Sequence, residues 1–174
     1  MNRYKRAAYI AVVLFLLVGL DHATKWTAIH CLRESGQTYI FPGDIFRLQY
    51  AENTGAFLSL GAGLPSAMRS LIMTGLNTVI LGGLLCYLFA SKTMSFLPGV
   101  ALTLIAGGGV GNLIDRFFRD GRVVDFMNMG VTIGKFSLRT GIFNIADVAI
   151  MAGLFLIILH EIMNIRKGED TNKK

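Results

Sequence analysis

The stretch AAYIAVVLFLLVGL, residues 7–20, decides the class of this protein. It contains only apolar residues and one glycine, and it follows the basic start MNRYKR. A helix of this length spans about 21 Å at 1.5 Å per residue, which is short of the roughly 30 Å hydrocarbon core of a bilayer. We therefore expect the helix to continue to about Ile29, which takes Asp21 and Lys25 into it. A signal peptide would end in a small-residue cleavage site, but DHATKW follows, which favours a retained span.

Three more apolar blocks are long enough to span a membrane. They cover about residues 67–90, 95–114 and 142–163. Apolar residues make up 53% of the chain, and four such blocks in 174 residues leave too little polar surface to cover them in water. The sequence therefore predicts a mainly α, polytopic membrane protein, with four transmembrane helices (the first over about 7–29) in a single domain over residues 1–174.

The connections over residues 30–66 and 115–141 are long, whereas only SKTMS joins the second and third spans. Apolar and polar side chains alternate in IFRLQYA (45–51), which indicates a strand. VTIGKFSLR (131–139) shows a weaker extended pattern. We expect these two connections to form a small β-rich element on one membrane surface beside the four helices.

The distribution of charge bears on orientation and on partners. Raw counts of Lys and Arg on the two sides of the spans are nearly equal, but the tails beside the first and last spans are dense in basic residues. Such tails favour a cytoplasmic position for both termini and attract anionic lipids. The formal charge of +6 comes without a basic run interleaved with aromatic residues, so a nucleic-acid partner is not expected.

Ionisable residues inside membrane spans cost about 2.5–3.5 kcal/mol each on insertion scales, so each needs a role. Asp21 and Lys25 are four residues apart and face each other on a helix. Such a pair either neutralises itself or holds a substrate backbone or head group. Asn112 and Arg116 have the same spacing near the end of the third span. The GGGVG run just before them (107–111) has GxxxG spacing, which lets another helix approach closely.

The stretch GNLIDRFFRDGRVVDF (111–126) contains three aspartates at the edge of this apolar territory. Asp115 can pair with Arg119 one helical turn later, and Asp120 lies beside a glycine in a turn-like segment. Asp125 differs, because its immediate neighbours in VVDF are all apolar. An apolar setting raises the pKa of a carboxyl group, which suits acid–base catalysis near neutral pH. Asp125 is therefore the catalytic candidate among the three.

A partner for Asp125 lies in FNIADVAI (143–150), which places Asp147 well inside the fourth span with no basic residue within seven positions. Two neighbouring carboxyl groups share a proton, so that one acts as a base toward water and the other as an acid toward a carbonyl. The structural alternative for Asp147 is a hydrogen bond between helices in its protonated form. Metal-site and nucleophile motifs are absent from the sequence, so aspartate chemistry is what remains.

Five motifs in their order along the chain resemble the bacterial lipoprotein signal peptidase (signal peptidase II) family of aspartyl peptidases. They are DxxxK (21–25), NTGAF (53–57), GNLIDR (111–116), VVDF (123–126) and FNIAD (143–147). The resemblance implies a four-helix enzyme of the bacterial inner membrane with an extracytoplasmic β-cradle and an active site near that surface. Its reaction would remove the signal peptide from diacylglyceryl-modified prolipoproteins, just before the lipidated cysteine, without metal or cofactor.

Carried over position by position, the family's catalytic pair falls on Asp125 and Asp147, the two residues chosen above from their surroundings. The resemblance assigns substrate binding to Asp21, Lys25, Asn53, Gly55, Asn112, Arg116 and Asn144. The implied partners are the prolipoprotein signal peptide with its diacylglyceryl cysteine, membrane lipids and cyclic peptide inhibitors of the globomycin type. We expect the enzyme to be a monomer.

Two features depart from the family pattern. NTGAF is one small residue shorter than the usual N-x-G-A-A-F, and the connection over residues 127–141 is long. A different class of protein, a small transporter subunit with carboxylates as a proton relay, would spread polar residues through the membrane depth and show internal repeats. A structural subunit of a larger complex would leave Asp125 and Asp147 dispensable. The clustering of polar residues at one end of the spans favours the peptidase.

Overall fold

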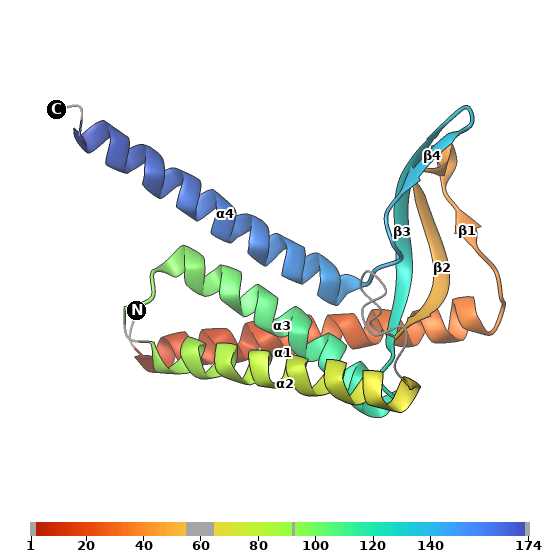
Figure 1. Cartoon of the computed structure of the whole chain (residues 1–174), viewed down its shortest axis with the longest axis horizontal. Coiled ribbons are helices and arrows are strands. Elements are labelled where there is room, and N and C mark those ends of the chain that lie inside the picture. Colours follow the sequence, from red (N-terminus) through yellow and green to blue (C-terminus); the bar gives the residue numbers. More distant parts are fainter. Residues whose placement is uncertain (1–2, 55–64, 92, 173–174) are drawn as a thin grey trace.

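The structure, a computed structural model, describes residues 3–54, 65–91 and 93–172. Four of its helices are long and apolar enough to cross a membrane. They are α1 (Arg3–Ala28), α2 (Ser66–Ala90), α3 (Phe96–Phe118) and α4 (Ile145–Asn172). Both termini lie at one end of the helices, and a small sheet lies across the other end (Figure 1). The predicted fold class, four membrane helices with a small β element, is confirmed.

The helix ends differ from the expected ones where polar residues gather. A π-helical turn, Ile29–Arg33, extends α1 beyond its expected end. Helix α3 continues through Phe118 and so includes Asp115 and Arg116. Helix α4 begins at Ile145 rather than at 142, because the backbone of Phe143 pairs with that of Met127 in the sheet.

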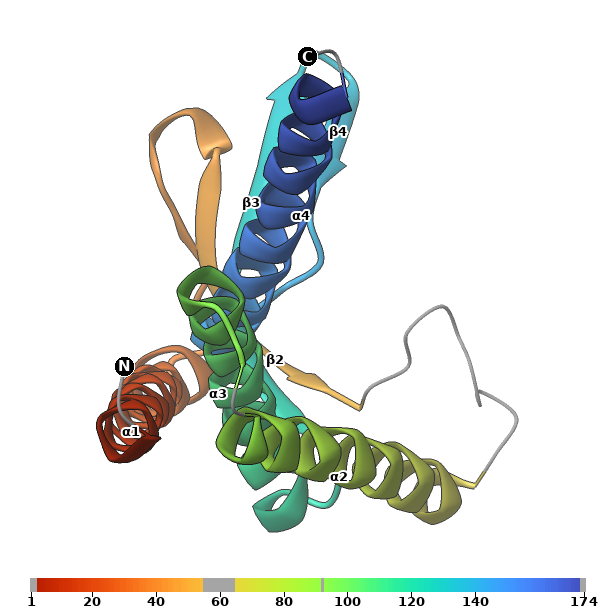
Figure 2. The same cartoon turned by 90° about the vertical axis from the view of Figure 1, so that its left-hand side faces the viewer.

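Helix α3 lies at the centre, with α1, α2 and α4 arranged around it (Figure 2). Glycines in α3 allow two of these helices to approach closely. A Cβ atom on Gly107 would collide with Leu17 of α1, and one on Gly108 would collide with the backbone of Ala146 in α4. The close approach predicted from the GGGVG run is therefore confirmed, and it brings the starts and ends of three helices to one junction.

The sheet has four antiparallel strands in the order β1-β2-β3-β4. The strands are β1 (Tyr39–Ile40), β2 (Phe46–Asn53), β3 (Val123–Ile133) and β4 (Phe136–Arg139), with a short 3-10 turn, η2 (Pro42–Asp44), before β2. Strand β2 confirms the strand predicted at 45–51. Both Asp120 and Gly121 have positive φ in the turn between α3 and β3, which reverses the chain so that β3 starts beside the end of α3.

A small apolar core fixes the sheet to the helices. Phe126 of β3 is buried against Ala28 and Leu32 at the end of α1, and Met127 and Ile145 pack around them. Burying a large apolar side chain contributes about 1.5–3 kcal/mol. This core holds the first residues of β3, and therefore Asp125, against the helix ends.

Candidate active site

Asp147 lies in the first turn of α4, so its expected place well inside the span is wrong. Its backbone N–H donates to Oδ1 of Asn144 (2.9 Å), and its Oδ2 accepts from the backbone N–H of Asn144 (3.1 Å). This reciprocal pair is a capping box that satisfies two backbone donors at the start of the helix. The helix N-terminus also favours a negative charge at this position. The same contacts that begin α4 therefore fix the Asp147 carboxylate.

Asp125 occupies the start of β3 and is buried, with 2% of its surface exposed. Its Oδ1 accepts a hydrogen bond from Nδ2 of Asn144 (2.7 Å), and the side chain of Asn53 also bonds to the carboxyl group. Burial, and then the nearby charge of Asp147, raise the pKa of Asp125 to about 6. The raised pKa expected from its apolar neighbours is confirmed. Asp125 can therefore hold and release a proton near neutral pH.

Two asparagine side chains connect the two carboxyl groups. Asn112 donates from Nδ2 to Oδ1 of Asp147 (2.8 Å), while its own Oδ1 accepts from Nδ2 of Asn144 (3.1 Å). Lys25 Nζ also donates to Oδ1 of Asn112 (3.0 Å). Because its oxygen is held by two donors, the Asn112 amide must present its N–H group to Asp147. The amide orientations are therefore fixed by the network.

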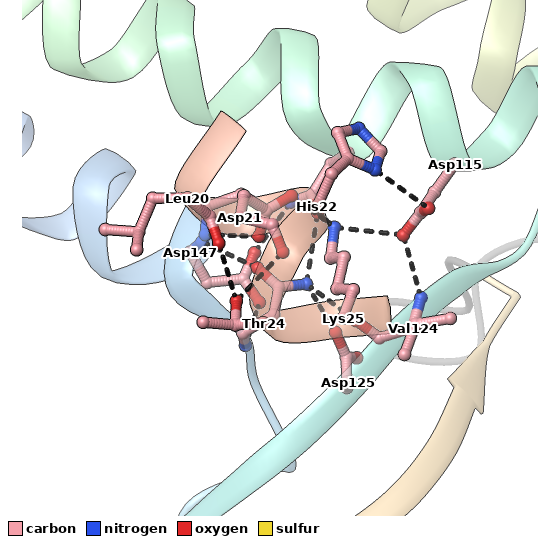
Figure 3. A network of polar contacts seen from close by, with 12 residues as sticks. Leu20, Asp21, His22, Thr24, Lys25, Asp115, Val124, Asp125 and Asp147 are labelled. Atoms are coloured by element: carbon pink, nitrogen blue, oxygen red, sulfur yellow. Dashed lines mark hydrogen bonds and ion pairs between the residues drawn. The ribbon is translucent and has the colours of Figure 1, made fainter. Parts of the chain in front are cut away.

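A buried ion cluster lies directly behind this network (Figure 3). Lys25 Nζ lies 2.7 Å from Oδ2 of Asp21 and 2.9 Å from Oδ2 of Asp115, and all three side chains are 1% exposed. Asp21 accepts from the backbone N–H of Ala146 (3.0 Å), and Asp115 accepts from that of Val124 (3.1 Å). The two acids thus hold the residues immediately before Asp147 and Asp125, while Lys25 neutralises part of their charge.

The structure brings the predicted site residues together, except for one residue that lies outside the described ranges. Arg116 donates to the backbone oxygen of Asn112 (3.3 Å) and interacts electrostatically with Asp125 and Asp147. Its buried Nε has no hydrogen-bond partner among the described residues. Asn53 ends β2 beside Asp125. Gly55 lies outside the described residues.

Asp21 and Lys25 do not lie where they could contact a substrate directly, because both side chains are buried and bonded to protein groups. The predicted pairing of Asp115 with Arg119 is confirmed, at 3.1 Å. The link from Lys25 to Asp115 was missed, and no signal in the sequence reveals it because the two residues are ninety positions apart. The helix-capping role of Asn144 could have been predicted from the sequence, because Asn followed three residues later by Asp is a helix-capping pattern.

The described side chains at this junction can transfer protons to and from a bound molecule. Two carboxyl groups face a set of amide, guanidinium and backbone donors that can orient a water molecule and a peptide. Among residues 3–54, 65–91 and 93–172, no group of three or more His, Cys, Asp and Glu side chains is arranged to hold a metal ion.

A four-span fold with buried carboxyl groups where the helices meet the sheet defines a polytopic membrane enzyme, and solved structures agree with this class. The fold is similar to two structures described as bacterial membrane enzymes. One has a TM-score of 0.68 and 27% identity over 88% of this chain and 92% of that chain. The other has a TM-score of 0.67 and 26% identity over 96% and 92%.

The sequence narrows the class to one family. The family model for signal peptidase (SPase) II matches residues 13–163. The lipoprotein signal peptidase of Chlorobium phaeovibrioides is 40% identical over 84% of this chain and 86% of its own length. That of Borrelia hermsii is 32% identical over 91% and 92%. The chain therefore belongs to the signal peptidase II family and is a multi-pass membrane peptidase. This membership gives no support to the proton-relay alternative.

Proposed function

We propose that this peptidase is of the aspartic type and that Asp125 and Asp147 are its catalytic pair. The observation that carries the proposal is the coupling of the two carboxyl groups through Asn144, which donates to Asp125 from its side chain and to Asp147 from its backbone. The pKa of about 6 at Asp125 supports the sharing of one proton between the two groups.

In the proposed mechanism Asp147 is the base and Asp125 is the acid. Both oxygens of Asp147 accept N–H bonds, an arrangement that suits a carboxylate. Asp147 takes a proton from water as the water oxygen attacks the scissile carbonyl carbon, and Asp125 gives its proton to the carbonyl oxygen. When the C–N bond breaks, the leaving amine takes the proton from Asp147. The hydroxyl proton of the intermediate returns to Asp125, which restores the starting state.

The surrounding residues have two kinds of role in this proposal. Asn53 and Arg116 contact the substrate backbone, since both lie beside the carboxyl groups and Arg116 Nε is available as a donor. The family motif assigns substrate binding to Gly55 as well. Asn112 and Asn144 orient the two carboxyl groups by hydrogen bonds. Any contact that they make with the peptide is made while they hold these bonds. Asp21 and Lys25 act from behind them as positioning residues.

The proposed substrate is a prolipoprotein whose cysteine carries a diacylglyceryl group, cut just before that cysteine. The names of the relatives, lipoprotein signal peptidases, support this class. The site lies at the end of the helices opposite the termini (Figure 1). With the basic tails in the cytoplasm of a bacterium, the site faces the extracytoplasmic surface of the inner membrane, where the signal helix reaches it through the lipid. We expect a monomer that cyclic peptides of the globomycin type inhibit.

Cleavage in lipid nanodiscs tests the proposed substrate. A prolipoprotein with the diacylglyceryl cysteine is compared with the same precursor without the lipid, and mass spectrometry locates the cut. We expect only the lipidated precursor to be cut, directly before the modified cysteine. Equal cutting of both precursors would refute the substrate class, and cutting of neither would refute the proposed function. A proton flux in liposomes that Asp125→Asn abolishes would support the relay instead.

A further inference from the structure

The β3–β4 hairpin has an apolar face that no described part of the chain covers. Val131, Ile133, Phe136 and Leu138 expose 52, 74, 85 and 83% of their surface. Val131 pairs with Leu138 and Ile133 with Phe136, and directly opposed residues of antiparallel strands share a face. The four side chains therefore form one continuous patch, here called the hairpin patch. Contiguous exposed patches of this kind mark a contact with a partner or a membrane.

The opposite face of the hairpin is polar, and it is occupied within the chain. Thr132 and Ser137, which lie between the patch residues, bond to each other at 3.2 Å. Thr132 also donates to Asp44 of the η2 turn (3.4 Å), and the Arg139 guanidinium pairs with the same carboxylate at 3.2 Å. A second bond joins Arg139 Nε to Oδ1 of Asn128. These contacts fix which face of the hairpin turns outward.

The patch continues the surface by which the sheet contacts the helices. Side chains alternate along a strand, so Val131 lies on the same face of β3 as Met127. Met127 pairs with Leu48 of β2, and both pack against the buried cluster of Ala28, Leu32 and Phe126 where the sheet meets the end of α1. Strand β3 runs across the axes of the helices, so the hairpin extends sideways from the bundle (Figure 1). The hairpin patch therefore lies on the side of the sheet that faces the ends of the helices.

The turn between the two strands adds a basic residue. Lys135 is exposed at this turn, directly before Phe136. A basic residue beside exposed aromatic and aliphatic side chains suits the interface of a bilayer, where anionic head groups attract cations and the acyl region accepts apolar groups. A protein partner would need complementary polar groups on this face, and the described hairpin presents only apolar side chains and this one charge there.

We propose that the hairpin patch rests in the interface of the same bilayer that surrounds the four spans, with Lys135 at the head groups of anionic phospholipids. This contact holds β3, and therefore Asp125, at a fixed height relative to the ends of α3 and α4. The proposal does not depend on the identity of the substrate, and it gives a role to the long connection over residues 127–141.

Tryptophan fluorescence in nanodiscs tests the contact. The single native tryptophan is first removed by Trp26→Phe, and Phe136→Trp then places an indole in the patch. The matched control is Ser137→Trp, one residue away on the polar face. The discs contain phosphatidylethanolamine and phosphatidylglycerol with bromine on the upper acyl carbons. We expect bromolipid to quench Phe136→Trp several-fold more than Ser137→Trp, and aqueous iodide to show the reverse order.

Two outcomes would overturn the proposal. Equal quenching of both variants by iodide, without bromolipid quenching, would show that the patch faces water. Protection of Phe136→Trp from both quenchers, in discs that hold two copies of the chain, would show that a second copy covers it. A photoreactive group on the lipid acyl chain provides a check on the unsubstituted protein, because cross-links must then appear within residues 131–138 in addition to the four spans. Lys135→Glu must reduce the bromolipid quenching of Phe136→Trp only when phosphatidylglycerol is present.

Discussion

Replacing Lys25 by methionine removes the only cation that contacts both Asp21 and Asp115 among the described residues. Methionine has nearly the same length, so the change removes charge with little change in packing. The two carboxylates remain buried, and Asp21 loses its paired cation while Asp115 keeps the partly exposed Arg119. Removing one partner of a buried ion pair costs about 3–5 kcal/mol. Asn112 Oδ1 also loses a charged donor. We therefore expect Lys25→Met to destabilise the fold by several kcal/mol and to reduce cleavage.

The matched control is Arg122→Met, which also breaks an ion pair at the same end of the molecule. Arg122 lies 2.8 Å from Glu52, but its side chain is 52% exposed. Exposed pairs contribute up to about 1 kcal/mol. The free energy of unfolding, measured by denaturant titration in mixed micelles, should fall much less for Arg122→Met than for Lys25→Met.

A rescue distinguishes loss of charge balance from loss of packing. Adding Asp21→Asn and Asp115→Asn to Lys25→Met removes the uncompensated charges, so most of the lost stability should return. The reasoning is refuted if Lys25→Met costs no more than Arg122→Met, or if the triple variant is less stable than Lys25→Met alone.

Two further predictions concern the catalytic strand and the helix junction. Burial raises the pKa of Asp125 from 3.8 to about 6, so between these values the native state binds a proton that the unfolded chain has released. The free energy of unfolding should fall as pH rises through this window, by at most about 3 kcal/mol, and Asp125→Asn should lack this fall. Parallel thermal-unfolding profiles of the wild type and Asp125→Asn from pH 4 to 8 would contradict this. Gly108→Val should strongly lower the unfolding temperature because its side chain would meet the backbone of Ala146, whereas Gly82→Val, which points into open space, should leave it nearly unchanged. Equal temperatures for the two valine variants would show that α3 and α4 do not need their close approach.

Local patterns were sufficient to predict several parts of the site. Apolar runs gave the four spans, the neighbours in VVDF distinguished Asp125, and the four-residue spacing predicted the pair of Asp115 with Arg119. Each of these depends on residues that are close in sequence. The expected start of the fourth span was wrong because Phe143 pairs with a strand instead of continuing the apolar run as a helix.

Contacts between distant segments could not be predicted in the same way. Lys25 reaches Asp115, and Asp21 reaches the backbone of Ala146, only because glycines in α3 let α1 and α4 come close. The GxxxG spacing predicts that another helix can approach α3, but it does not show which helices do so. The burial of Asp21 and Lys25 therefore became visible only in the folded chain.

The most direct test of the central claim is the rate at which Asp125→Asn and Asp147→Asn cut a diacylglyceryl-modified prolipoprotein. Asp120→Asn, in the exposed turn just before β3, is the control because it makes the same chemical change five residues from Asp125. We predict that both variants of the pair remain folded and lose at least about 10²–10⁴-fold in rate, while Asp120→Asn stays near the wild-type rate. A folded Asp125→Asn or Asp147→Asn enzyme that cuts at nearly the wild-type rate would contradict the account.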